Sequence, residues 1–396
     1  MEYILLLINI LQILLLFYLG ITTLYLIVFA IAGLFKIKPL ISVNHKLNRI
    51  AVLVPGYKED NVILDVAKMA LQQSYPNEKY DVVIIADSFH PSTLQLLKEL
   101  PIKVIEVQFE KSTKAKALNK AFEILGDEYD IAVILDADNI METDFLKKLN
   151  EAFIPGTLAI QGHRTAKNMN TSFAVLDAIS EEINNHIFRK GHLNLGLSSA
   201  IIGSGVGFDY HYFKNLSKSI TAVGGFDKEI ELAMLKNHKK INYLHDAWVY
   251  DEKVQKAEVF SNQRRRWLSA QVHYFRKYFL NSIIVLIFKG NFEYFNKAFQ
   301  FIQLPRVLLL GFLTILTPLF LYFNVVTHQT YCFYIWIITL VVCLLTFAIS
   351  VPKRMYNYQT YKALQSLPKG MFLMLLSLIK IKGANKKFIH TTHGHQ

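Results

Sequence analysis

The sequence has few of the residues that mark a disulfide-bonded or zinc-binding protein. Only two cysteines occur among its 396 residues, Cys332 and Cys343, and both lie inside a long apolar run. Cysteines in such a run are typical small apolar residues of a membrane helix, so neither a disulfide framework nor a zinc site is expected. Acidic residues are also scarce, 31 against 43 basic ones, and the formal net charge is +12. No DNA- or RNA-binding motif accompanies this basic excess, so no nucleic-acid partner is expected.

Charge is missing altogether from a long segment near the N-terminus. No charged residue occurs from residue 3 to residue 35, whereas a helix needs roughly 20 residues to cross a bilayer. The segment also lacks the basic start and small-residue cleavage site of a signal peptide, so residues 1–36 are predicted to form a retained transmembrane anchor. Residues 304–352 hold two further apolar runs and predict two more transmembrane helices. The apolar content of 52% agrees with a membrane protein.

Basic residues flank these apolar runs, and they predict the orientation of the chain. They are Lys36, Lys38, Lys46, Arg49, Lys353 and Arg354. By the positive-inside rule, the central region and the C-terminus face the cytosol, so we expect an integral protein of the cell (inner) membrane with a cytosolic central domain. Residues 271–303 are aromatic and amphipathic, which predicts interfacial helices in contact with membrane lipids. Residues 353–396 are expected to form another interfacial helix and a basic cytosolic tail.

From residue 49 onward, short β-branched runs alternate with segments of helical spacing. The runs are residues 50–54, 82–86, 104–107 and 131–135, and the helical segments are 61–73, 91–100 and 114–125. This alternation predicts an α/β domain with a parallel sheet. Each run ends at a polar or turn-forming residue, and open α/β sheets bind ligands beyond the carboxyl ends of their strands.

The sequence Asp136-Ala137-Asp138 directly follows the fourth run. Magnesium-like cations take carboxylate ligands and keep positions for phosphate oxygens, so this pair could hold a metal and a nucleotide diphosphate. A bare Asp-X-Asp is also common as a polar turn in which Asp138 or Asn139 caps a helix.

Three more strand ends carry residues suited to a nucleotide diphosphate. Pro55, Tyr57 and Glu59 belong to a turn after the first run, Asp87 follows the second, and Lys114 begins the helical segment after the third. Asp87 could accept hydrogen bonds from a base or a ribose, and Lys114 could bind phosphate. Each residue alone could equally lie in a turn or on a solvated face. Their coincidence at one sheet edge favours a shared binding site.

The motifs Val-Pro-Gly-Tyr-Lys-Glu, Ala-Asp-Ser, Lys-Ala-Lys-Ala-Leu-Asn and Asp-Ala-Asp occur in an order that resembles the nucleotide-sugar half of family 2 glycosyltransferases. The sequence from Gln263 to Trp267 resembles the Gln-X-X-Arg-Trp motif of membrane-bound members such as cellulose, chitin and hyaluronan synthases and ceramide glucosyltransferases. The small-residue loop that begins at Gly203 also resembles one in the family. The resemblance covers residues 48–270 and implies a GT-A fold and inverting transfer.

The resemblance also implies roles for individual residues. It gives the metal, Mg²⁺ or Mn²⁺, to Asp136 and Asp138, and the donor nucleotide to Pro55, Tyr57, Glu59, Asp87, Lys114 and Asp136. It gives the acceptor and the diphosphate to Gly203, Ser204, Gln263, Arg266 and Trp267. Taken alone, the arginines of the last motif could also form a basic patch at the membrane surface.

The catalytic base is the point at which this sequence departs from the family pattern. The family usually carries Thr-Glu-Asp before Glu-Leu, whereas this chain reads Gly-Gly-Phe-Asp-Lys-Glu-Ile-Glu-Leu from residue 224. Alignment on Glu-Leu gives Glu229, and alignment on the start of the helix gives Asp227. We favour Asp227, because a short side chain at a helix N-terminus is held firmly, although it could also serve only as a helix cap.

The sequence therefore predicts an inverting, metal-dependent glycosyltransferase that uses a nucleotide sugar, with UDP-sugar favoured, and a polysaccharide or lipid-linked acceptor. The alternative is a catalytically degenerate membrane protein that binds a nucleotide sugar or scaffolds a partner. His163, Arg164, His186 and His245 are given no role, since a lone histidine is more often structural than functional. The oligomeric state is left open.

Overall fold

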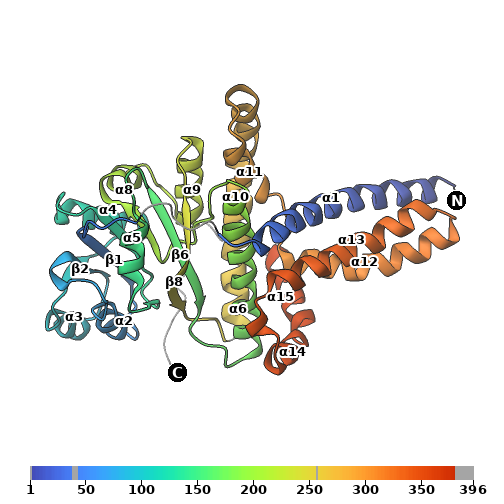
Figure 1. Ribbon diagram of the computed structural model, residues 1–396. Helices are drawn as coiled ribbons and strands as arrows, with labels where there is room; N and C mark the ends of the chain where they lie inside the picture. The colour runs from blue at the N-terminus through green and yellow to red at the C-terminus, as the bar shows by residue number, and fades with distance from the viewer. Residues whose placement is uncertain (1, 38–42, 256, 380–396) are drawn as a thin grey trace.

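The computed structural model describes residues 2–37, 43–255 and 257–379. It consists of an α/β domain and a bundle of long apolar helices that extends from one side of that domain (Figure 1). The predicted tail falls partly outside the described residues, at 380–396.

The α/β domain is built on one eight-stranded sheet in the order β3-β2-β1-β4-β7-β6-β8-β5. The parallel half comprises β1 (Ile50–Tyr57), β2 (Tyr80–Asp87), β3 (Lys103–Val107) and β4 (Ile131–Ile134). The mixed half comprises β5 (Ile140–Met141), β6 (Ala159–Ala166), β7 (Val206–Asp209) and β8 (Asn242–Asp251). β7 runs antiparallel to β4, so the strand direction reverses beside the Asp-X-Asp sequence. The predicted α/β fold and its first four strands are confirmed.

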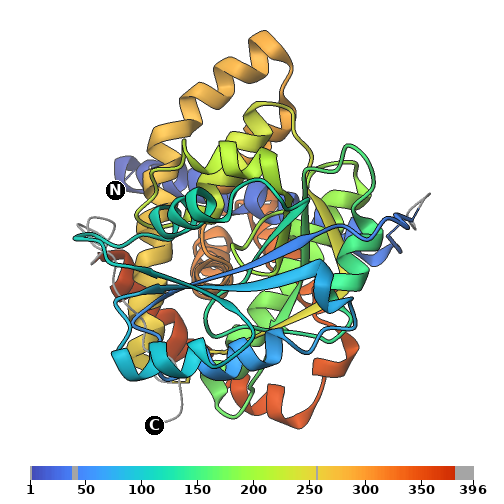
Figure 2. The same cartoon turned by 90° about the vertical axis from the view of Figure 1, so that its left-hand side faces the viewer.

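Both faces of the sheet are covered, which explains the continuous apolar character of the parallel strands. Along β1, Ala51 and Leu53 join one core, while Val52 and Val54 join the other. Helices α4 (Lys114–Leu125), α8 (Tyr210–Ser217) and α9 (Phe226–Lys236) pack on the first face. Helices α2 (Ile63–Ala70), α3 (Pro91–Lys98) and α5 (Phe145–Ala152) pack on the second, and Figure 2 shows the sheet between these layers. A short 3-10 turn, η1 (Asn77–Lys79), leads into β2.

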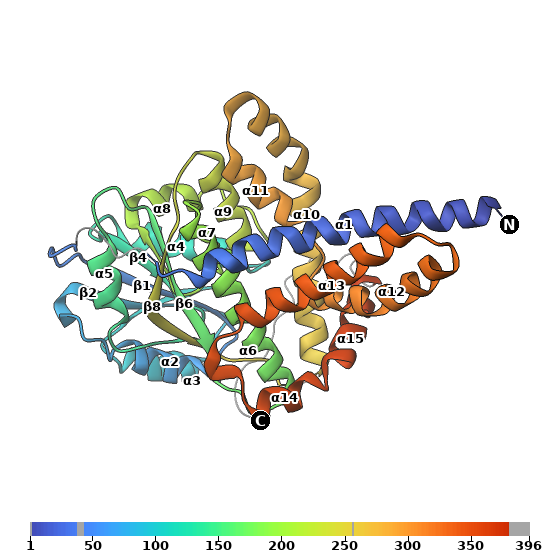
Figure 3. The same cartoon turned by 45° about the vertical axis from the view of Figure 1, so that its right-hand side comes forward.

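Among the described residues, three helices are long and apolar enough to cross a membrane, as predicted: α1 (Glu2–Leu34), α12 (Arg306–Val326) and α13 (Thr330–Ser350). They lie side by side in Figures 1 and 3. Trp336 of α13 stacks on Phe320 of α12 with ring centroids 4.9 Å apart. Beyond them follow a 3-10 turn, η3 (Lys353–Met355), and the shorter helices α14 (Tyr358–Leu364) and α15 (Leu367–Ile379).

Helix α1 is joined to the α/β domain through a π-helical segment. α6 (Ser172–Asn184) continues into this segment, η2 (Asn185–Gly191), and then into α7 (His192–Asn194). A Cβ atom on Gly191 would lie 2.1 Å from the carbonyl oxygen of Phe29, so only glycine allows α1 to approach so closely. The ring of Phe29 stacks on His192 at 3.8 Å. This close packing fixes α1 against the domain.

A single long helix connects the domain with the bundle. α10 (Ala257–Lys289) runs for 33 residues and is followed by α11 (Phe292–Gln300). In Figure 1, α10 stands across the direction of α1, α12 and α13 at the junction of the two parts. The helix passes through residue 270, where the sequence had suggested a domain limit, without a break.

Candidate active site

A cavity of about 590 Å³ opens at the carboxyl ends of the parallel strands. All but two of the residues predicted for the site line it: Pro55, Tyr57, Glu59, Asp87, Lys114, Asp136, Asp138, Gly203, Asp227, Gln263, Arg266 and Trp267. The two exceptions are Ser204 and Glu229. Residues far apart in the sequence are therefore brought to one place, as the strand-end argument requires.

Helix α4 directs a lysine at the Asp-X-Asp carboxylates. The Thr113 hydroxyl caps the helix by accepting from the Lys116 amide at 3.3 Å. Lys114 then pairs with the carboxylate of Asp136 and donates to the carbonyl oxygen of Gly203 at 2.6 Å. Gly203 has a φ of +82°, and a Cβ atom there would lie 3.4 Å from the Cβ of Asp227. The Asp-X-Asp loop, the lysine and the Gly203 loop thus form one continuous wall of the cavity.

Ser204 supports this wall from behind. Its side chain is fully buried, and its hydroxyl accepts from the backbone amide of Asp136 at 2.9 Å. When the side-chain amide of Asn139 is oriented to satisfy all its partners, it donates to the carboxylates of Asp138 and Asp251 at 3.0 Å each. The carbonyl oxygen of the same amide accepts from the Ser204 hydroxyl at 2.6 Å. Ser204 was expected to face the acceptor, but here it holds the Asp-X-Asp loop in place.

Asp87 lies at the end of β2 and is almost completely buried. Its carboxylate accepts from the Ser88 hydroxyl at 2.9 Å. Its carbonyl oxygen accepts from the backbone amide of Lys58, a residue with a φ of +56°, at 3.1 Å. This contact ties the turn after β1 to the end of β2, so Asp87 and the turn present one surface to the cavity.

The two candidate bases occupy different environments. Asp227 lies in the first turn of α9, which begins after Gly225, and lines the cavity. Glu229 is buried, with only 6% of its surface exposed, and does not line the cavity. Its carboxylate accepts from the Thr221 amide at 3.0 Å and lies 3.2 Å from the Lys277 ammonium group. The N-cap residue of α9 is Gly225, so no N-cap side chain caps this helix start.

The Gln-X-X-Arg-Trp sequence lies within α10, on the part of the helix that borders the cavity. Gln263, Arg266 and Trp267 line it, and burial lowers the pKa of Arg266. Arg264 points away and pairs with Asp177 of α6. Its guanidinium group also lies 4.2 Å from the ring centroid of Trp267. Arg264 is buried and Arg266 lines the cavity, so these two arginines do not form a patch at the surface.

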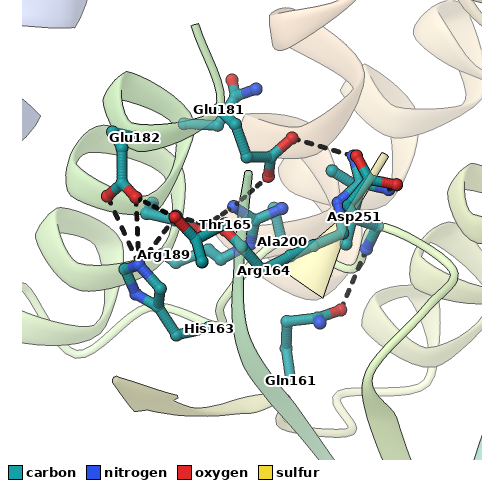
Figure 4. Close-up of polar contacts among 12 residues, drawn as sticks. Gln161, His163, Arg164, Thr165, Glu181, Glu182, Arg189, Ala200 and Asp251 are labelled. Carbon is teal, nitrogen blue, oxygen red and sulfur yellow. Dashed lines mark hydrogen bonds and ion pairs between the residues drawn. The ribbon is translucent and has the colours of Figure 1, made fainter. Parts of the chain in front are cut away.

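A buried ionic network borders the cavity, and no sequence motif predicted it (Figure 4). Arg164 of β6 donates to Glu181 of α6 at 2.8 Å, and Arg189 approaches the other oxygen of the same carboxylate at 3.1 Å. Lys253 lies 2.7 Å from Asp251. Burial alone would raise the pKa of Glu181, but the neighbouring Arg164, Lys253 and Arg189 outweigh it and lower the pKa. The adjacent Glu181 and Glu182 of α6 were a signal of this network in the sequence.

Comparison with known proteins agrees with this geometry. The model of the family described as glycosyltransferase like family 2 matches residues 48–270. The chain belongs to this family. A curated relative, a beta-monoglucosyldiacylglycerol synthase from Nostoc sp., is 25% identical over 232 residues, which are 55% of this chain and 48% of that protein. The chain thus spans about half the length of this curated relative.

Among solved structures, a mannosyltransferase from Pyrobaculum calidifontis in complex with GDP-Man and Mn²⁺ has a similar fold. The TM-score is 0.57 at 16% sequence identity, and the match covers 93% of this chain and 97% of that one. This family 2 glycosyltransferase therefore has the GT-A fold that the sequence motifs implied, with apolar helices at both ends.

The carboxylates of this glycosyltransferase fit a divalent metal that is shared with a substrate. Asp136 and Asp138 both line the cavity. In the described part of the chain, no group of three or more histidine, cysteine or acidic side chains could hold a metal by itself. Mg²⁺ and similar ions are often bound by one or two carboxylates together with substrate phosphates, which is the donor set available here.

Arg264 is predicted to position Trp267 for transfer. Arg264→Ala removes the pair with Asp177 and the contact with the indole. We expect kcat/KM to fall by up to about a hundredfold, since small displacements of a positioning group can cost that much. Arg264→Lys keeps the positive charge but lacks the planar guanidinium group, so its activity should lie between those of the wild-type protein and Arg264→Ala.

The matched control is Arg265→Ala, on the same helix but outside the cavity lining, which should retain activity. Steady-state kinetics and thermal unfolding are measured for all three variants. Full activity of Arg264→Ala would show that the contact has no positioning role.

Proposed function

We propose that this protein transfers a sugar from a nucleotide diphosphate sugar, with UDP-sugar as the favoured donor, to the hydroxyl group of a membrane lipid. The transfer proceeds with inversion at the cytosolic face of the cell membrane and uses Mg²⁺ or Mn²⁺. The name of the curated relative, which describes a glucosyldiacylglycerol synthase, supports a lipid acceptor.

The observation that carries this proposal is the reach of the cavity towards the membrane anchor. From Asp136 and Lys114 the cavity lining extends to Lys297, Gln300 and Phe301. The segment that contains these last residues is bonded to α1. The Tyr18 hydroxyl donates to the carbonyl oxygen of residue 302 at 2.7 Å, and the Tyr25 hydroxyl donates to the side chain of Asn296 at 2.9 Å. One end of the cavity thus holds the residues proposed to bind the donor, and the other adjoins the candidate membrane span α1.

The side chains in between suit an inverting displacement. The carboxylate of Asp227 would accept the proton of the acceptor hydroxyl as this oxygen attacks the anomeric carbon, opposite the departing diphosphate. Lys114 and Arg266 would stabilise the growing negative charge of the diphosphate. A divalent ion at Asp136 and Asp138 would supply further charge neutralisation. The indole of Trp267, 38% exposed, would offer an apolar face to a sugar ring.

A cytosolic orientation is supported by the basic flanks of the spans. Lys36 follows α1, and Lys353 and Arg354 follow α13. The guanidinium group of Arg354 also pairs with Glu182 of α6 at 2.8 Å, so this flank lies against the α/β domain. Basic residues next to transmembrane helices favour the cytosolic side.

Sealed vesicles test the activity, the acceptor and the orientation together. Inverted membrane vesicles containing the protein, supplied with radiolabelled UDP-sugar and Mn²⁺, should incorporate label into solvent-extractable lipid. Sealed right-side-out vesicles should incorporate none until they are permeabilised. Label in material that organic solvent does not extract would instead indicate a polysaccharide acceptor. Donor binding without nucleotide diphosphate release from any panel of UDP-sugars would favour a degenerate binding protein.

A further inference from the structure

The α10–α11 hairpin, residues 257–300, carries a row of exposed apolar side chains near its tip. Leu280, Ile287 and Phe288 are 72%, 70% and 80% exposed, and Ile284 and Phe292 are also exposed. On α10 these positions follow one another at intervals of four, three and one residues, which places them on one face of the helix. Large apolar side chains gathered on one exposed face usually mark a contact with a membrane or another protein.

The hairpin is held firmly to the domain, so the exposed face does not result from loose packing. The side-chain amide of Asn291 donates to the carbonyl oxygen of Leu235 in α9 at 2.9 Å. Val285 and Tyr294, on the inner sides of the two helices, are buried in the same core as the sheet. The apolar face therefore remains outside in the folded protein.

An aromatic row links the hairpin to the membrane anchor. Phe292, Phe295 and Phe299 lie at intervals of three and four residues on α11, and so on one side of it. Phe299 approaches Tyr25 of α1 with ring centroids 5.6 Å apart, and Phe295 lies 6.2 Å from Phe299. The row thus begins at a membrane-spanning helix and runs outward along the hairpin, across the direction of the spans (Figures 1 and 3).

The charges on the hairpin also suit a lipid surface. Towards the base of α10, the exposed face continues with Arg276 and with Lys277, whose ammonium group pairs with Glu229, and Lys289 follows the apolar residues at the tip. Basic residues beside an apolar helix face attract anionic headgroups, while the apolar side chains enter the boundary between headgroups and acyl chains.

We propose that the tip of the α10–α11 hairpin, formed by Leu280, Ile284, Ile287, Phe288 and Phe292, inserts into the cytosolic interface of the lipid bilayer. The occupant of this face is lipid and not a second copy of the chain. The inference rests on the position of the hairpin relative to the membrane-spanning helices and does not depend on the identity of the acceptor.

A spin label at the tip tests the proposal in the full-length protein in lipid bilayers. Labels are attached at Phe288→Cys and Ile284→Cys in a chain that carries Cys332→Ala and Cys343→Ala. The control is Ile124→Cys on α4, which is exposed in the α/β domain away from the spans. Collision with molecular oxygen, which partitions into lipid, is compared with collision with a water-soluble nickel chelate.

We expect the labels at the tip to be more accessible to oxygen and less accessible to the nickel chelate than the label at the control position. Nickel accessibility equal to that of the Ile124 position would mean that the tip stands in water and would overturn the proposal. Low accessibility to both reagents would show that protein covers the face, and a second copy would then replace lipid as its occupant. Neither measurement requires sugar transfer, so failure here is separable from failure of the proposed function.

Discussion

Asp138→Ala is expected to abolish sugar transfer while the protein remains folded. The carboxylate of Asp138 lines the cavity and is only 7% exposed. Without it, a divalent ion would lose one of two protein ligands, and the diphosphate would lose charge stabilisation. A loss of several kcal/mol corresponds to a fall of about a thousandfold or more in rate.

The measurement is product formation by purified protein across a Mn²⁺ titration, with elution volume and thermal unfolding as tests of folding. Asp246→Ala is the matched control, because this carboxylate is 57% exposed and outside the cavity lining. A chelator should abolish product formation by both the wild-type protein and the control variant. Transfer that persists at the wild-type rate in Asp138→Ala or in chelator would exclude the proposed metal role.

Asp227→Asn is expected to lower kcat by roughly a hundredfold or more with the KM for the donor nearly unchanged, since general-base catalysis typically contributes about 10²–10⁴-fold. The carboxylate reaches the cavity beside Gly203, whereas Glu229 does not line it. Asparagine matches aspartate in size and would preserve any capping role, so a large loss of turnover reports on the proton-accepting oxygen.

Glu229→Gln serves as the comparison. Glu229 is buried beside the ammonium group of Lys277, so the substitution should lower stability more than turnover. Thermal unfolding and single-turnover rates separate the two effects. An unaffected Asp227→Asn together with a folded but inactive Glu229→Gln would assign the base to Glu229 and favour the alignment on Glu-Leu.

Much of the fold and cavity could be predicted because the signals were local. Runs such as residues 131–135 are apolar because both faces of their strands are covered, and each polar residue directly after a run lies at the same sheet edge. Asp87 and Asp136 were found in this way, and Lys114 was found at the start of the helix that follows the third run. The candidate membrane-spanning helices were equally easy to predict, because their length and lack of charge alone identify them.

The rest depends on contacts that no local pattern records. Arg264 meets Asp177 across 87 residues, and Ser204 meets Asp136 across 68. A serine in a small-residue loop looks the same in sequence whether it faces a substrate or supports a neighbouring loop. Arg164 and Glu181 are charged, so the sequence alone suggests that they lie on the surface. In the fold they are buried together as an ion pair.

The unbroken course of α10 has a mechanical consequence. Trp267 and Phe288 lie 21 positions apart on one rigid rod, which at about 1.5 Å per residue separates them by roughly 30 Å. A tilt of about 5° at one end of such a rod displaces the other by roughly 3 Å, more than the ~1 Å by which a positioning group can shift before rates fall steeply. With the tip inserted in the bilayer as proposed above, bilayer thickness and lateral pressure would shift Trp267, and the transfer rate would depend on the composition of the membrane.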